Sequence, residues 1–444
     1  MTLSRELARY ALSAQPADIP AAVQHEALRS ILNWVGCAVG GSRHAAVEHT
    51  LAALLPFSAG NQCTLIGRRE RIDALHAALI NGMSAHVLDF DDTHLRTLLH
   101  PSVPVASSLL ALAERRPVNG RDFLLAFIVG VEIECRIANA IWFAHNSHWY
   151  ITGTAGVFGA AAAAARVLGL DEDQTTHALG IAAAQSAGTR EMAGTMTKSF
   201  IHGRAAQNGL LAALLAQQGF TAAETSLEGP HGFAPVLAAE PDLAAITAGL
   251  GVTYELLQNS YKPFACGVVA HPVIDACIQL RNEHHLHASD IESVALKTSP
   301  RALGLTGIQS PPNGLKSKWS IYHSAAVAFI DGAAGEHQYT DKRVNDPIVR
   351  ALRERITATA DTQLQEIAAK VSVTLKDGSV LAKHVERVTG SAENPMTDRD
   401  LEDKVRGLAR GILAEERTSA LIAACWSLGK LNDVADLARA ATPA

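Results

Sequence analysis

The 444-residue sequence is poor in aromatic and charged side chains, which make up 5% and 18% of it. Hydrophobic residues make up 48%, and alanine is abundant. A chain of this composition can bury a large interior, which excludes a disordered protein. Small alanine side chains allow helices to pack closely, so the composition predicts a helix-rich protein. The length exceeds that of one ordinary core and predicts two domains.

Long stretches of a single character are also missing. No block of Lys and Arg stands out and the formal net charge is −6, so we expect no nucleic-acid partner. No run of about 20 apolar residues is free of polar interruptions, so we expect no membrane span. The first residues carry Glu6 where a secretory leader has an apolar segment. An acidic protein that handles an anionic substrate must concentrate its positive charge locally.

The cysteines lack the spacing of metal ligands. They form no Cys-x-x-Cys pair and no Cys/His cluster with zinc-like spacing, so we expect no metal. Scattered thiols in a long chain are typical of a reducing compartment, and we expect a cytoplasmic protein. The six are Cys37, Cys63, Cys135, Cys266, Cys277 and Cys425.

Helical periodicity dominates the first part of the chain. Gly40-Gly41-Ser42 divides the first helical stretch into two helices, because glycine breaks a helical pattern. Proline after His100 favours a new helix directly after it. The predicted helices lie at 21–56, 71–88, 102–115, 122–140, 157–168, 173–188 and 202–218.

Shorter β-rich pieces follow. Residues 294–298 and 369–375 alternate between apolar and polar, as strands do. Asp377-Gly378 is a hairpin turn signal, which predicts a return strand over 380–388. Residues 398–440 return to a helical pattern.

These patterns predict a mainly α protein with a smaller α+β domain. We place a large all-helical domain at 1–265 and 398–444. The α+β domain is inserted between these segments, at 266–397.

An acidic segment is the first candidate site. Asp89-Phe90-Asp91-Asp92-Thr93 follows the helix at 71–88 and leads to His100-Pro101. Carboxylates are unfavourable at a helix C-terminus, where the helix dipole is negative. Three of them require a compensating cation or a hydrogen-bond network. The segment is therefore either a solvated loop or a functional site, and its spacing matches no standard metal site.

A second candidate lies between two predicted helices. Arg190 and Lys198 stand in a segment rich in Thr and Gly. An arginine can hold a carboxylate with two hydrogen bonds. A lysine in a partly dry pocket can have a lowered pKa and serve as a base. The alternative is a pair of ordinary surface cations.

A third candidate follows a cluster of aromatic residues. Tyr150 stands before Thr152-Gly153-Thr154 at the start of a helix. Free N–H groups at such a terminus can bind an anion. The alternative is a threonine cap beside a tyrosine of the core. The crowded residues are Trp142, Phe143, His145, His148, Trp149 and Tyr150.

The fourth candidate stands where the two domains join. Lys262 and His271-Pro272 lie close together there. The alternative is a hinge that packs on its own aromatic residues.

At these segments the sequence resembles the MmgE/PrpD family of 2-methylcitrate dehydratases, cis-aconitate decarboxylases and iminodisuccinate epimerases. The motifs occur in order over almost the whole chain. They are His86-Val87-Leu88-Asp89-Phe90-Asp91-Asp92-Thr93, His100-Pro101-Ser102, Thr152-Gly153-Thr154-Ala155-Gly156, Lys198-Ser199-Phe200-Ile201-His202-Gly203-Arg204-Ala205-Ala206, Lys262-Pro263-Phe264-Ala265-Cys266, Lys318-Trp319-Ser320 and Glu393-Asn394-Pro395.

The resemblance implies an active site between a helical and an α+β domain, a homodimer, and neither metal nor organic cofactor. By motif match it implies five active-site positions: Asp89, Thr93, His100, Lys198 and Lys262.

The chain also departs from the family pattern. Dehydratases and decarboxylases of the family usually have a histidine where Tyr150 stands. They often place a histidine at Gly267, and they tend to have a tyrosine where His323 stands. The acid and base groups thus differ while the anion-binding frame remains, so the chain looks more similar to the epimerase branch.

Our leading hypothesis is therefore an epimerase that removes a proton next to a carboxylate of iminodisuccinate or a similar amino-dicarboxylate. Lys198 and either Tyr150 or His100 would flank the carbon as catalytic groups. Tyrosine has a pKa near 10, so a nearby cation such as Lys198 or Arg190 must lower it before it acts as a base.

The substrate-binding residues predicted on this hypothesis carry charge or hydrogen-bonding groups. They are Asp89, Thr93, Arg190, Lys262 and His323.

One alternative function is a lyase that dehydrates or decarboxylates a tricarboxylate, with His100 at the centre of its site. Another is a non-catalytic binding protein on the same fold.

Overall fold

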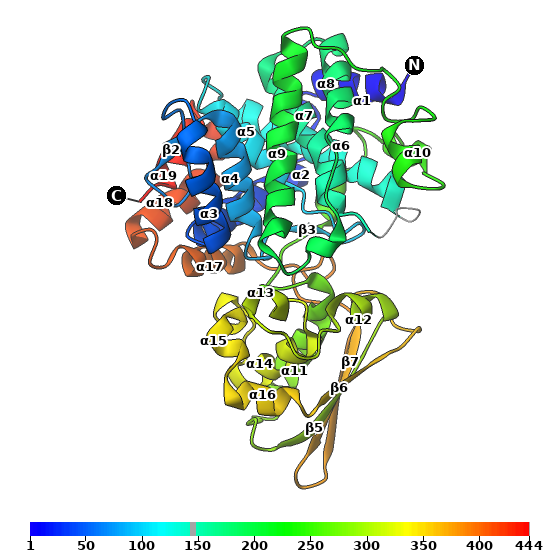
Figure 1. The fold of residues 1–444 in the computed structure, drawn as a ribbon, viewed down its shortest axis with the longest axis vertical. Helices are drawn as coiled ribbons and strands as arrows, with labels where there is room; N and C mark the ends of the chain where they lie inside the picture. Colours follow the sequence, from blue (N-terminus) through cyan, green and yellow to red (C-terminus); the bar gives the residue numbers. More distant parts are fainter. Residues whose placement is uncertain (143–147, 444) are drawn as a thin grey trace.

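The structure is a computed structural model, and it describes residues 1–142 and 148–443. It has two bodies, a larger helical one and a smaller one with a β-sheet, which lie one above the other in Figure 1. This arrangement confirms the predicted fold class, a mainly α protein with a smaller α+β part.

The larger body consists of helices from both ends of the chain. The C-terminal helices return to it, and the first two of them pack on α2. Its helices are α1 (Leu3–Ser13), α2 (Ala21–Gly41), α3 (Ala45–Leu54), α4 (Ala74–His86), α5 (Ser102–Ala113), α6 (Gly120–Trp142), α7 (Ile151–Leu168), α8 (Glu172–Ala184), α9 (Met196–Gln217), α10 (Phe233–Leu237), α17 (Asp398–Ala409), α18 (Glu415–Trp426) and α19 (Ala435–Ala440).

Helix α7 is the centre of this body. It packs against α5, α6, α8 and α9, and its alanine side chains are fully buried. By length and composition alone α7 could cross a membrane, but 89% of its residues are buried inside the protein. Its apolar surface is thus covered by neighbouring helices, as in a core helix.

The smaller body combines one four-stranded sheet with short helices. The strand order is β6-β5-β7-β8, with β5 parallel to β6 and antiparallel to β7. The elements are α11 (His271–Glu283), β5 (Ile291–Thr298), α12 (Pro300–Thr306), α13 (Gly314–Ser317), α14 (Ile321–Asp331), α15 (Asp341–Val344), α16 (Pro347–Arg353), β6 (Ile356–Ala360), β7 (Ala369–Leu375) and β8 (Val380–Val385).

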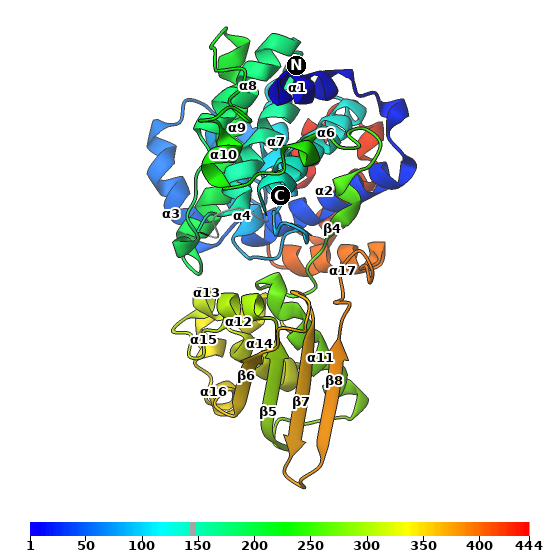
Figure 2. The same ribbon diagram turned by 90° about the vertical axis from the view of Figure 1, so that its right-hand side faces the viewer.

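The hairpin predicted in this body is present. β7 and β8 pair antiparallel, with Thr374 opposite Val380. Gly378 in the turn has φ +88°, a backbone conformation that glycine adopts without strain. Figure 2 shows the sheet beside α11 and α14 and the two chain segments that connect the bodies. The proposed domain bounds, 1–265 with 398–444 and 266–397, stay a prediction.

Two glycines bring α4 and α9 into close contact. A Cβ on Gly82 would lie 2.8 Å from the Cα of Gly203, and one on Gly203 would lie 2.3 Å from the Leu79 carbonyl oxygen. Only residues without a side chain permit this approach. As a result, His86 at the end of α4 and His202 on α9 lie side by side.

The start of α9 differs from the prediction. We expected a connecting segment as far as residue 201, but the helix begins at Met196 and includes Lys198. Thr195 has an extended backbone with φ −121°, and the helix follows directly from it. Lys198 is therefore held on a helix within the protein interior.

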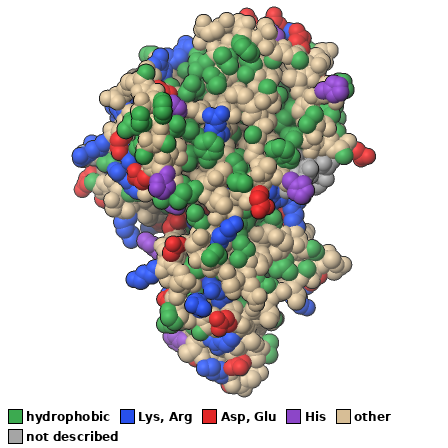
Figure 3. All heavy atoms as spheres, viewed as in Figure 1, with side chains coloured by type: hydrophobic (Ala, Val, Ile, Leu, Met, Phe, Trp, Pro, Cys, Tyr) green, Lys and Arg blue, Asp and Glu red, His purple; other side chains and the backbone are tan. Residues whose placement is uncertain are grey.

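Charged side chains are scattered over the surface. On the face shown in Figure 3, Lys and Arg alternate with Asp and Glu, and no broad patch of one sign is visible. The six cysteines are all buried and unpaired.

Candidate active site

The candidate site is built around the loop after α4. The loop leads from His86 to two short strands, β3 (Thr93–His94) and β4 (Asn259–Ser260), which pair antiparallel. Asp89 in this loop has φ +53°, a left-handed conformation that is uncommon outside glycine. Such strain persists where the surrounding structure fixes it, which occurs often at functional sites.

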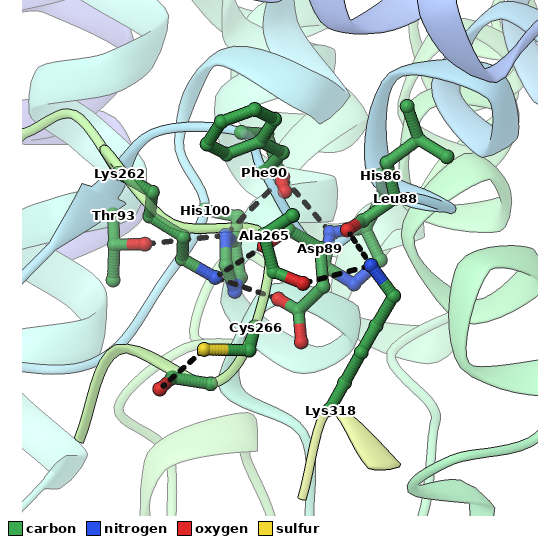
Figure 4. Close-up of polar contacts among 12 residues, drawn as sticks. His86, Leu88, Asp89, Phe90, Thr93, His100, Lys262, Ala265, Cys266 and Lys318 are labelled. Atoms are coloured by element: carbon green, nitrogen blue, oxygen red, sulfur yellow. Dashed lines mark hydrogen bonds and ion pairs between the residues drawn. The ribbon is translucent and has the colours of Figure 1, made fainter. Parts of the chain in front are cut away.

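Three lysines bind three consecutive carbonyl oxygens of this loop. Lys318 Nζ donates to the Leu88 oxygen at 2.6 Å, and Lys404 Nζ donates to the Phe90 oxygen at 2.7 Å. Lys262 Nζ lies 3.2 Å from the Asp89 oxygen between them. Figure 4 shows Lys262 and Lys318 reaching the loop from opposite sides.

The lysines come from three separate parts of the chain. Lys262 follows β4, Lys318 belongs to the smaller body, and Lys404 lies on α17. Lys318 also donates to the Ala265 oxygen at 2.8 Å and pairs with Glu336 at 2.7 Å. These ammonium groups are the cations that the acidic helix terminus required.

Asp89 holds two of the predicted site residues. Its carboxylate lies 2.6 Å from Lys262 Nζ and 3.0 Å from Lys198 Nζ. Burial by itself would raise the pKa of Asp89, but the two lysines outweigh it and hold that pKa well below its usual range. Asp89 is therefore ionised, and it links α9 to the segment after β4.

The two lysines have pKa values shifted in opposite directions. Burial lowers the pKa of Lys198, although Asp89 acts in the opposite direction. For Lys262, burial is outweighed by Asp89, and the pKa is raised. Lys262 is thus a fixed cation, whereas Lys198 releases its proton more easily.

The backbone and the acidic loop fix the orientation of His100. Its Nδ1 lies 2.8 Å from the Asp92 carbonyl oxygen, 3.2 Å from Asp91 Oδ2 and 3.5 Å from Thr93 Oγ1. Two of these groups only accept hydrogen bonds, so Nδ1 carries the proton in the neutral ring. The unprotonated Nε2 is then available as a base.

Asp91 and Asp92 lie behind His100 and are fully buried. Asp91 Oδ2 also accepts from His86 Nδ1 at 2.8 Å. Burial raises the pKa of Asp92 to about 6, although Ser102 and Asn259 each donate to its carboxylate at 2.6 Å.

A stack of histidines lies beside His100. The rings of His86 and His202 are nearly parallel, with centroids 3.4 Å apart. His202 Nδ1 donates to the Lys198 carbonyl oxygen at 2.8 Å. Burial lowers the pKa of His86 to about 3 and that of His202 well below its usual range, so both rings are neutral.

Ring nitrogens of His86, His100 and His202 lie within 4.8 Å of one another, a distance that admits a metal ion. Ring orientation argues against one. An ion shared by two parallel rings would lie outside the plane of each ring and away from its lone pair. The absence of a metal therefore stays a prediction.

Tyr150 stands at the N-terminus of α7, as predicted. Its backbone N donates to the Gly188 oxygen at 2.9 Å, and its hydroxyl is buried without a partner among the described residues. Burial and Asp89 both raise its pKa, and Arg190 only partly offsets them. The expectation of a lowered Tyr150 pKa was wrong, because burial and Asp89 outweigh Arg190 and the raised pKa favours the protonated hydroxyl.

The helix terminus itself is partly occupied. Thr152 Oγ1 accepts from the His100 backbone N at 3.0 Å, which ties His100 to α7. Of the aromatic cluster before α7, Phe143 and His145 lie outside the described residues.

Seven of the eight predicted site residues line one chamber of about 60 Å³. It adjoins an outer cavity of about 730 Å³ that shares Trp142, Trp149, Arg190, Leu305 and Trp319 with it. The chamber residues are Asp89, Thr93, Leu98, His100, Trp142, Trp149, Tyr150, Ile151, Arg190, Lys198, Lys262, Gly267, Val268, Val269, Leu305 and Trp319.

His323 is the exception, and its predicted role in substrate binding was wrong. It does not line the chamber; it lies fully buried within the smaller body. Its Nε2 is 2.8 Å from the Gln338 carbonyl oxygen, and its ring packs near Tyr339. His323 was predicted at the site because it follows Trp319 closely in the sequence. Trp319 precedes α14 and lines the chamber, whereas His323 lies in the first turn of α14 and is buried in the smaller body.

Several residues around the site were not assigned a role from the sequence. Asp91, His86, His202 and Lys318 belong to the motifs quoted above, so the motifs contained a signal for them. Lys404 belongs to none of these motifs, and only the packing of α17 brings it to the loop.

A chamber in which cations, a histidine base and a tyrosine hydroxyl converge is typical of an enzyme that moves protons on an anionic substrate. The sequence matches the MmgE/PrpD N-terminal domain over residues 5–245 and the C-terminal domain over 264–428. The chain therefore belongs to the MmgE/PrpD family.

Curated relatives span nearly the same length. A cis-aconitate decarboxylase of Aspergillus terreus is 28% identical, covering 98% of this chain and 95% of the relative. That of Mus musculus is 28% identical over 86% and 82%. A 2-methylcitrate dehydratase of Cupriavidus necator is 26% identical over 82% and 81%. These relatives are lyases.

Proposed function

We propose that this protein is a lyase, which moves a proton at a carbon next to a carboxylate and expels water or CO2. The relatives support this alternative of our sequence hypothesis better than epimerisation of iminodisuccinate. The observation that carries the proposal is that the His100 ring, oriented through its Nδ1 by the acidic loop, and the Tyr150 hydroxyl, whose pKa burial raises, line one chamber.

Each group has a role in an elimination. His100 Nε2 takes the proton from the carbon next to a carboxylate, and the electron pair left behind spreads onto that carboxylate. The positive charges of Lys262 and Lys198 stabilise the added negative charge, and Arg190 binds a carboxylate of the substrate. Tyr150 gives its proton to the departing hydroxyl, which leaves as water, and the carbon–carbon double bond forms.

The raised pKa of Tyr150 distinguishes this reaction from epimerisation. An epimerase that works in both directions needs each flanking group to take up a proton in turn. A buried tyrosine whose pKa burial raises is a poor base and a suitable acid. Epimerisation by Lys198 and His100, without Tyr150 as a base, is the second candidate because burial lowers the pKa of Lys198.

The test compares three substrates in D2O by NMR: 2-methylcitrate, cis-aconitate and iminodisuccinate. Loss of water or CO2 from either of the first two supports the lyase. Deuterium uptake with inversion of iminodisuccinate, and without loss of either product, contradicts it. His100→Asn should lower turnover by roughly 10²-fold or more, the usual effect of a lost general base. His284→Asn, at an exposed position of the smaller body, is the matched control.

We also propose, from the family resemblance alone, a cytoplasmic homodimer that acts without a cofactor. Analytical ultracentrifugation of the full chain tests the oligomeric state.

A further inference from the structure

The chamber has one charged side and one apolar side. We propose that its substrate carries two carboxylates and an apolar arm, in place of a third carboxylate. The inference rests on the proposed function, since it names the substrate class of the same site.

The apolar side is a small hydrophobic cluster separate from the main core. Val268 and Val269 are buried within it, and Leu98 and Leu305 are half-buried. All four line the chamber. Leu98 comes from the loop after β3, whereas the other three come from the smaller body. Both bodies thus present alkyl side chains to the same part of the substrate.

Leu98 is held in a strained conformation to reach this position. Its φ is +58°, a left-handed value that is uncommon outside glycine. The tight turn that contains it is fixed by hydrogen bonds: the N–H groups of Thr97 and Leu98 donate to the His94 oxygen at 3.1 and 2.8 Å. Strained residues of this kind cluster at functional sites, and this turn places the Leu98 alkyl group at the wall of the chamber.

The charges of the chamber match two carboxylates. Among the described residues that line it, the cations are Lys198, Lys262 and Arg190, and the anion is Asp89, so the net charge is +2. Arg301 at the outer cavity is already paired with Glu366 at 3.1 Å. A third carboxylate would therefore meet alkyl side chains without a partner, which costs several kcal/mol.

The apolar side also has space. Gly267 lines the chamber, and a Cβ on it would meet nothing closer than the Trp319 ring at 3.5 Å. That Cβ would be in ordinary van der Waals contact with Trp319 and the Lys318 carbonyl oxygen, so a side chain would fit at this position without a clash. The glycine leaves the volume of such a side chain to the substrate.

A matched pair of ligands tests the inference directly. Citrate is malate with a carboxymethyl arm at C2, and 2-isobutylmalate carries an uncharged arm of the same shape. Binding is measured by calorimetry on the wild-type chain, so the result does not depend on turnover. We expect 2-isobutylmalate to bind at least tenfold more tightly than citrate. From 2-methylmalate to longer unbranched arms, affinity should rise about fourfold per methylene group until the wall is covered.

One substitution should reverse the preference. Leu305→Arg places a cation on the apolar side and should shift the ratio of the two dissociation constants toward citrate by roughly tenfold or more. Leu305→Met, which keeps an apolar side chain of similar volume, should leave the ratio unchanged. The ligand pair and the arm series need no variant, and they test the proposal even where Leu305→Arg fails to fold.

The outcomes separate this inference from the proposed function. If citrate binds as tightly as 2-isobutylmalate or more tightly, the apolar arm is wrong, and lyase activity on a tricarboxylate still stands. A second contrary outcome concerns cis-aconitate. If it binds more tightly than an analogue with an isobutyl arm in place of its carboxymethyl arm, and if it loses CO2, the apolar side receives the departing carboxylate and the inference is overturned. If 2-isobutylmalate is preferred but no ligand reacts, the substrate class stands and the lyase proposal fails. If neither ligand binds, the inference is wrong.

Discussion

The two sides of the chamber differ in how their polar groups are paired. On the Asp89 side, the carboxylate has two lysine partners and each loop carbonyl has one. On the Tyr150 side, the Tyr150 hydroxyl is buried without a hydrogen-bond partner among the described residues, and Arg190 lines the chamber with it. Paired groups are fixed before substrate arrives, whereas unpaired groups remain available to it.

This contrast gives the two sides different expected functions. The Asp89 side maintains the position of His100 and the two lysines, so its loss should affect folding as well as activity. Loss of the Tyr150 hydroxyl should affect activity alone, because that hydroxyl makes no hydrogen bond within the described structure.

The largest effect is expected from Lys262→Met. The substitution leaves Asp89 with one cation and frees the Asp89 carbonyl oxygen, and breaking a buried ion pair costs about 3–5 kcal/mol. We expect this loss in the free energy of urea unfolding, together with loss of turnover. The control is Lys383→Met, which removes an exposed pair with Glu283 at 2.6 Å and should cost at most about 1 kcal/mol. Equal losses for the two variants would contradict the comparison.

Asp92→Asn should change how stability depends on pH. The pKa of Asp92 in the folded chain, about 6, lies above its ordinary value of 3.8, so the folded state binds this proton more tightly. The ionised Asp92 carboxylate therefore lowers the free energy of unfolding above pH 6. This destabilisation disappears as the pH falls toward 4 and the carboxyl group is protonated. The variant should be more stable than the wild type at pH 8 by up to about 3 kcal/mol, with no such gain at pH 4. Urea unfolding across this range checks it, and a pH-independent difference would contradict it.

Tyr150→Phe should lower kcat by roughly 10²-fold, the usual effect of a lost general acid. The unfolding free energy should not fall, because the hydroxyl that is removed is buried without a partner among the described residues. Steady-state kinetics and urea unfolding measure both. The control is Tyr322→Phe in the smaller body, away from the chamber. A variant that works at the wild-type rate would leave Tyr150 as a packing residue.

Arg190→Ala should raise KM roughly tenfold or more and leave kcat nearly unchanged, because a charged hydrogen bond to a substrate carboxylate is lost. Arg190→Lys should recover part of the affinity, since the charge remains but the planar fork does not. Arg350→Ala, at an exposed site, is the control. A collapse of kcat with unchanged KM would show that the assigned role is wrong.

The smallest effect is expected from metal removal. Excess EDTA should leave activity unchanged, because the stacked rings of His86 and His202 do not direct their lone pairs to one ion. Activity that is lost with EDTA and restored by a divalent ion would contradict this prediction. The metal site would then be expected at His86, His100 and His202.

Local patterns predicted most of the secondary structure. The break at Gly40-Gly41 separates α2 from α3, and Asp377-Gly378 lies in the turn between β7 and β8. The start of α9 was predicted too late, because the Thr- and Gly-rich segment before Phe200 has weak helical propensity and the packing of α9 on α4 and α7 decides its extent.

The sequence by itself determined the family frame: buried helices from alanine-rich periodic segments, a sheet from alternating ones, and the site residues contained in the motifs. It also posed the problem of three carboxylates at a helix terminus, because charge and helix polarity depend only on local order. Tertiary structure alone decided the solution, in which Lys262, Lys318 and Lys404 bind successive carbonyls of one loop. It also raised the pKa of Tyr150 and removed His323 from the site. Burial and the meeting of distant segments set these properties, and neither is encoded in the spacing of residues along the chain.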